Sequence, residues 1–104
     1  MLYLFGITPK KAVALLPKAL RDFLGLCFYF WSNEGGDNRE PIHVHISKGK
    51  PAANATKIWL KSDGSLEISN NNSRLTENEL AKALDYIRVN YNNIIAEWYR
   101  HFGM

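Results

Sequence analysis

The chain has 104 residues, of which 46% are hydrophobic and 22% are charged, and its formal net charge is +3. These values fit a single globular domain over residues 1–104 and exclude a disordered chain. The small positive charge permits nucleic-acid binding without requiring it, because dedicated binders carry a denser basic patch. The single cysteine, Cys27, excludes an internal disulfide and favours a cytoplasmic location. No stretch approaches the roughly 20 apolar residues that a membrane span needs.

The first 25 residues are expected to form an N-terminal extension to a core over residues 26–103. Leucine and phenylalanine side chains recur at helical spacing over residues 9–26, and this pattern predicts an N-terminal helical segment. Pro17 interrupts the pattern because it lacks a backbone N–H, so a kink is expected there. Gly25 is the expected end of the segment.

The middle of the chain predicts a small antiparallel sheet of three to four strands. An aromatic run comes first, and both of its faces are expected to be covered. The stretch "IHVHIS" then alternates between branched apolar and polar residues, which is typical of a strand with one buried face. Asp63 and Gly64 form a hairpin signal between the last two strands. The strands are expected over residues 26–33, 42–47, 56–62 and 65–69.

A long helix is predicted at the C-terminal end. Thr76 and Glu79 form a capping box, in which each side chain bonds the backbone N–H of the other residue. A helix of about 25 residues would span roughly 37 Å and cross the whole sheet. The predicted architecture is therefore α+β, with the sheet packed on this helix. The apolar stripe of the helix consists of Leu80, Leu84, Ile87, Tyr91, Ile94 and Trp98.

Two of the three histidines, His43 and His45, stand on one predicted strand with a single residue between them. Side chains two apart on a strand share a face, with Cβ atoms about 6–7 Å apart. Such a pair can bind a divalent transition metal such as zinc if further ligands approach. The alternative is a pair of polar residues that hydrogen-bond to nearby carboxylates. The candidate further ligands are Glu97 and His101, or Asp37 and Glu40.

A second hypothesis makes His43 and His45 a general acid/base pair in a metal-free ribonuclease. Histidine titrates near neutral pH, so two histidines can exchange a proton with the substrate and the leaving group. Arg39, Lys48 or Lys50 would then supply positive charge to the developing oxyanion.

A third hypothesis concerns the polar face of the sheet as a whole. Basic residues around an exposed aromatic ring suit RNA or single-stranded DNA, because the base stacks and the cations neutralise phosphate. In the alternative interpretation Trp59 belongs to the core and is covered by the N-terminal helix. The residues of this predicted binding surface are Arg39, Lys48, Lys50, Lys57, Trp59 and Lys61.

The end of the C-terminal stripe, with Trp98 and Phe102, is expected to be core. A seam with a partner helix, or a homodimer, is the alternative that the spacing leaves open. Cys27 lies inside an apolar strand and is expected to be a small core residue.

Three ordered motifs resemble the bacterial family called domain of unknown function 4160. They are "REPIHVHI" at Arg39–Ile46, "ATKIWL" at Ala55–Leu60 and "AEWYRHFG" at Ala96–Gly103. The resemblance covers residues 26–103. It departs from the family pattern at Ile42, where a second proline is common, and it leaves residues 1–25 unmatched.

The resemblance implies a small bacterial protein without a settled biochemical activity. Members are often encoded beside a second small protein, in an arrangement like a toxin–antitoxin pair. The leading hypothesis is therefore a binding module for such a protein partner, with RNA or DNA and a second copy of the chain as further candidate partners. The positions that match the family signature are His43, His45, Lys57, Trp59 and Trp98.

Overall fold

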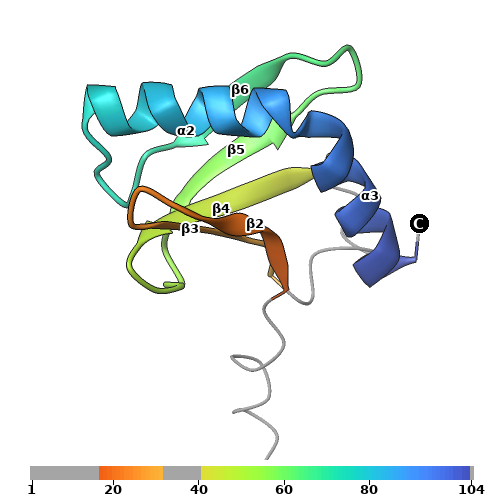
Figure 1. Cartoon of the computed structure of the whole chain (residues 1–104), viewed down its shortest axis with the longest axis horizontal. Helices are drawn as coiled ribbons and strands as arrows, with labels where there is room; N and C mark the ends of the chain where they lie inside the picture. The colour runs from red at the N-terminus through yellow and green to blue at the C-terminus, as the bar shows by residue number, and fades with distance from the viewer. Residues whose placement is uncertain (1–16, 32–40, 104) are drawn as a thin grey trace, which may run out of the picture.

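The structure is a computed structural model that describes residues 17–31 and 41–103 (Figure 1). It contains a five-stranded antiparallel sheet followed by two helices, which confirms the predicted α+β class. The strands lie side by side in chain order, so each pairs with the next one along the sequence. The strands are β2 (Lys18–Phe23), β3 (Leu26–Tyr29), β4 (His43–Lys48), β5 (Thr56–Leu60) and β6 (Leu66–Asn70). The helices are α2 (Glu77–Val89) and α3 (Tyr91–Phe102).

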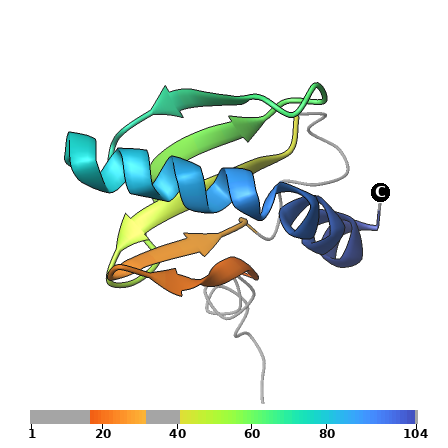
Figure 2. The same cartoon turned by 45° about the horizontal axis from the view of Figure 1, so that its top comes forward.

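One face of the sheet is covered by α2, whereas α3 leaves that face at an angle and packs beside β2 (Figures 1 and 2). The core lies between the sheet and these helices. Val44, Ile46 and Ile58 are fully buried from the sheet side, and Ile87 and Ile94 are fully buried from the helix side. Neither helix of the described ranges is long and apolar enough to cross a membrane.

The predicted N-terminal helix is wrong where the structure describes it. Residues 18–23 form β2, which pairs with β3, and Leu24 and Gly25 make the turn between the strands with positive φ angles of 54° and 75°. Two register shifts in this pair place extra residues on β2, and these bulges disturb the alternation expected of a strand. The rest of the predicted helix, residues 9–16, lies outside the described residues.

The single long C-terminal helix is also wrong, because the helix breaks at Asn90. The Asn90 amide side chain donates to the Tyr86 carbonyl (2.9 Å) and so competes with the regular backbone bonds at the end of α2. The predicted apolar stripe nevertheless faces the core on both sides of the break. The change of direction allows Trp98 to meet Phe30, with ring centroids 5.3 Å apart.

Two local predictions are confirmed. The Thr76 hydroxyl accepts from the Glu79 N–H at 3.0 Å, and the Glu79 carboxylate accepts from the Thr76 N–H at 2.9 Å. At the hairpin between β5 and β6, Gly64 has a φ of 91° and its N–H donates to the Lys61 carbonyl. Both devices satisfy backbone groups that would otherwise lose hydrogen bonds on folding.

Candidate functional site

The two histidines lie on the sheet face opposite α2, as the alternation of β4 predicts. His43 stands opposite Trp59 of β5, and His45 stands between Tyr29 of β3 and Lys57 of β5. The neighbouring valine and isoleucine of β4 point to the helix side and are fully buried. The histidines therefore share this face of the sheet with Lys57 and Trp59.

The His43 imidazole is enclosed by other rings. Its solvent-exposed fraction is 0%, and its centroid lies 5.2 Å from Trp59, 5.4 Å from Trp98 and 5.2 Å from His45. The Nδ1 atom lies 2.8 Å from the Pro41 carbonyl oxygen, which can only accept, so Nδ1 carries a proton and donates. His43 thus connects β5 with α3 through packing and fixes its own ring by a backbone hydrogen bond.

His45 lies in the next layer of the same stack. It is 6% exposed, stacks on Tyr29 at 5.8 Å, and meets Trp31 edge to face at 6.1 Å. The Tyr29 hydroxyl donates to the Ala52 carbonyl (2.7 Å) and accepts from the Ala52 N–H (2.8 Å). The β4–β5 connection therefore folds back over this part of the sheet.

The β4–β5 connection also covers the part of this face that lies at the end of β4 and the start of β3. The Ser47 hydroxyl donates to the Lys50 carbonyl, and the Cys27 thiol donates to the Gly49 carbonyl at 3.2 Å. Burial raises the pKa of the Cys27 thiol, which disfavours the reactive thiolate. Cys27 is a buried residue beside Tyr29 and Ala55, as the sequence analysis expects.

The burial of both histidines favours packing over proton transfer. A general acid or base must come within hydrogen-bond reach of its substrate, and His43 has no exposed surface. Cleavage of RNA by this pair stays a prediction that the structure leaves to experiment.

The predicted metal ligands are not gathered into a cluster by the described part of the chain. Within residues 17–31 and 41–103, no three His, Cys, Asp or Glu side chains form a group that could hold a metal ion. Glu97 instead accepts from Arg100 at 2.8 Å and lies 3.4 Å from the His101 imidazole. Asp37 and Glu40 lie outside the described residues, so a metal site that includes them stays a prediction.

The predicted basic surface is divided between the two faces of the sheet. Lys48 points to the helix side and lies 3.5 Å from the carboxylate of Glu79 at the start of α2. Lys50 is exposed in the β4–β5 connection, and Arg39 lies outside the described residues. These three residues therefore do not form one described patch with Trp59.

The other three members of that surface do lie together. The Lys57 ammonium stands over the Trp59 ring, 4.3 Å from its centroid, in a cation–π contact. Lys61 forms a 2.7 Å ion pair with Glu67, which raises the pKa of Lys61. Lys57 therefore covers one face of the Trp59 ring, and the charge of Lys61 is balanced by Glu67.

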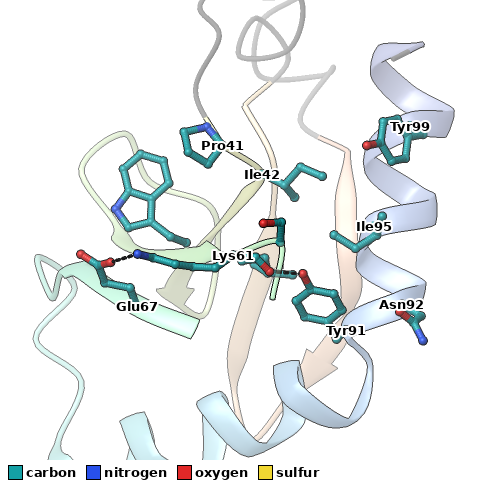
Figure 3. Close-up of a pocket in the computed structure, with 11 residues that line it drawn as sticks. Pro41, Ile42, Lys61, Glu67, Tyr91, Asn92, Ile95 and Tyr99 are labelled. Atoms are coloured by element: carbon teal, nitrogen blue, oxygen red, sulfur yellow. Dashed lines mark hydrogen bonds and ion pairs between the residues drawn. The ribbon is translucent and has the colours of Figure 1, made fainter. Parts of the chain in front are cut away.

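A groove of about 690 Å³ lies at the end of the sheet where β4 begins and β5 ends. Ile95 and the two tyrosines of α3 line one side, and Lys61 and Glu67 line the opposite side (Figure 3). The Tyr91 hydroxyl donates to the Lys61 carbonyl and so joins the two sides. The lining residues are Pro41, Ile42, Trp59, Leu60, Lys61, Ser62, Glu67, Tyr91, Asn92, Ile95 and Tyr99.

Of the groove residues, the sequence predicts only Trp59 and Lys61 as members of a binding surface. Its pattern places Tyr91 in the core stripe and indicates no role for Ile95 or Tyr99. A signal was present, because Tyr91, Ile95 and Tyr99 recur every four residues and mark a second helix face. Tyr99 is 48% exposed, so this large aromatic side chain of α3 lies outside the core.

These features define a small α+β protein with one helix-covered sheet face and an aromatic groove at the end of its strands. The chain belongs to the family described as Domain of unknown function (DUF4160), which matches residues 25–99. The resemblance carried by the three motifs is thereby confirmed, and β2 precedes the matched range. Comparison with curated proteins and with solved structures gave no match.

Proposed function

We propose that this chain is a protein-binding module and that the aromatic groove receives an apolar segment of the partner. The observation that carries the proposal is the set of three aromatic side chains, Trp59, Tyr91 and Tyr99, that line one groove. Tyrosine and tryptophan are enriched at the centres of protein interfaces, where they bury a large area at a low cost in side-chain entropy. A volume of about 690 Å³ is within the range of ligand-binding clefts.

Charge favours a protein over a nucleic acid at this groove. Among the described residues that line the groove, Lys61 is the one cation, and its ion pair with Glu67 balances their two charges. A nucleic-acid site needs an excess of cations to release counterions from phosphate. The Lys57 ammonium also occupies one face of the Trp59 ring, where a base would have to stack.

The proposed partner is a small protein encoded beside this gene, in a toxin–antitoxin-like or regulatory pair. This part of the proposal is supported by the gene arrangement that the family resemblance implies. The groove supplies the surface through which the two proteins would associate.

A photo-crosslinking amino acid at position 99 tests the proposal in cells. The matched control carries the same amino acid at position 89, because Val89 is 84% exposed and lies outside the groove. We expect one protein to be captured at position 99 and not at position 89. Capture of nuclease-sensitive material at position 99 would instead show a nucleic-acid site.

The captured protein must then bind when both proteins are purified. Tyr99→Ala should weaken this binding by at least tenfold, whereas Val89→Ala should leave it unchanged. Equal affinities of the two variants would refute the groove as the docking site. Binding of RNA and of DNA, measured at two salt concentrations, completes the comparison.

A further inference from the structure

We infer that the groove recognises an uncharged, extended peptide segment of about four residues that contains proline. The inference rests on the proposed function and specifies the chemistry of the segment that the partner inserts. It is carried by the length of the groove, its charge balance and the arrangement of its rings.

The length of the groove follows from one face of α3. Tyr91, Ile95 and Tyr99 stand four residues apart and line the groove together. At 1.5 Å per residue they span about 12 Å along the helix axis. A polyproline II segment rises 3.1 Å per residue, so about four residues match this length.

A helical segment fits the groove less well. A helix with its side chains is at least about 10 Å across. An extended segment of the same length is narrower and can place alternate side chains between the two walls.

Addition of a strand to the free edge of the sheet is also disfavoured. The edge strand β6 pairs Asn70 with Lys57 and Ile68 with Ile58, so Ser69 is an extra residue in the ladder. Such a bulge interrupts the regular row of backbone groups that an added strand would use. The bound segment therefore depends on side-chain contacts in the groove.

The charge balance selects an uncharged segment. Lys61 and Glu67 form a 2.7 Å ion pair at the rim and neutralise each other. A charged peptide would place an unbalanced charge against aromatic and aliphatic side chains, which is unfavourable. A neutral segment leaves the ion pair intact.

The rings suit proline. Flat aromatic side chains that line a groove bind proline-rich segments, which are already extended and lose little entropy on binding. The Tyr91 ring is held in place by its bond to the Lys61 carbonyl. The Tyr99 hydroxyl makes no hydrogen bond to any other described residue, so it can donate to a carbonyl of the peptide.

The probe that tests the inference is acetylated decaproline amide. Binding is measured by backbone amide chemical shifts and by tryptophan fluorescence, with an acetylated Gly-Ser decapeptide amide as the control. A peptide with alternating proline and glutamate tests the selection against charge. We expect decaproline to bind at least tenfold more tightly than either, with shift changes at residues 91–99.

Three variants place the binding in the groove. Tyr99→Ala should weaken decaproline binding at least tenfold, Tyr99→Phe should weaken it less because the ring remains, and Val89→Ala should have no effect. Decaproline binding no tighter than that of the Gly-Ser peptide, or equal in the Tyr99→Ala variant, would overturn the inference. If position 99 still crosslinks to a true partner protein through a helical or charged segment, the proposed function stands and this inference alone fails. If decaproline binds as expected but no protein is captured, the groove chemistry stands and the proposed function fails.

Discussion

His43 and Trp59 face each other across β4 and β5, and their rings meet edge to face with centroids 5.2 Å apart. The same imidazole contacts Trp98 of α3. One side chain therefore touches both Trp59, which lines the groove, and the helix that forms the opposite wall. His43 packs between these two parts of the groove, so we expect it to act as a positioning residue.

Replacement of His43 should reveal this packing role as a loss of stability. His43→Ala should lower the free energy of unfolding by on the order of 3 kcal/mol, because it leaves a cavity among buried rings. His43→Phe keeps a ring but loses the hydrogen bond to Pro41, so a smaller loss, of at least about 1 kcal/mol, is expected. Urea denaturation of both variants gives the comparison, and equal losses would contradict the packing role.

The ribonuclease hypothesis can be tested with variants of these histidines that are expected to stay folded. His43→Phe and His45→Phe retain ring volume in the stack. If packing is their only role, any RNA cleavage by the purified protein should be the same in the parent and in both folded variants. Loss of cleavage in both variants, while urea denaturation shows that each is still folded under the assay conditions, would establish the acid/base pair instead.

Thr76 should contribute to stability through its cap alone. Its hydroxyl accepts from the Glu79 N–H at the first turn of α2. Thr76→Ala removes that acceptor and should cost about 1 kcal/mol. Thr76→Ser keeps the oxygen and should stay close to the parent in thermal unfolding. A Ser variant as unstable as the Ala variant would show that the lost methyl group, and not the cap, is responsible.

The other half of the capping box makes stability depend on acid pH. The hydrogen bond from the Thr76 N–H, assisted by Lys48, lowers the pKa of Glu79. A carboxyl group with a lowered folded-state pKa adds stability above its unfolded pKa, and this stability is lost as the pH falls through the folded pKa. The parent should therefore weaken on acidification.

Glu79→Gln isolates that contribution. Glutamine can still accept a hydrogen bond from Thr76 but does not titrate. The variant should lose less stability than the parent between neutral and acid pH, as measured by urea midpoints at a series of pH values. Asp63, whose pKa is lowered by its bonds to Ser65, keeps a residual slope of the same sign in both proteins. Identical slopes would show that the carboxylate of Glu79 has no net effect.

The parts of the fold that the sequence predicts correctly are those where local chemistry and tertiary packing agree. The alternation of "IHVHIS", the Asp63–Gly64 turn and the capping box all depend on neighbouring residues. β2 is different, because its apolar residues follow helical spacing while pairing with β3 determines its conformation. The bulges of this strand shift its side chains out of strict alternation, so the sequence alone favours the wrong element.

The candidate site is less predictable than the fold for a related reason. The sequence places His43 and His45 on the polar face of β4, but their burial depends on rings from β3, β5 and α3. The groove depends on the break at Asn90, which changes the direction of α3. A single straight helix would have put Tyr91, Ile95 and Tyr99 elsewhere, and the uniform apolar stripe gives no sign of a break.

Tyr91 and Tyr86 offer a matched pair for the last prediction. The hydroxyl of Tyr91 donates to the Lys61 carbonyl across the groove, and that of Tyr86 donates to the Arg21 carbonyl at 3.0 Å, away from the groove. Phenylalanine at either position removes one hydroxyl and should cost about 1 kcal/mol of stability. Both losses can be measured by urea denaturation.

Only the Tyr91 variant should change binding. Without the bond to Lys61 the ring loses its fixed orientation, and the two sides of the groove are no longer joined at that point. Tyr91→Phe should therefore weaken decaproline binding several-fold, whereas Tyr86→Phe should bind like the parent. If the two variants lose the same stability and also bind decaproline with equal affinity, the Tyr91–Lys61 bond stabilises the fold without shaping the groove.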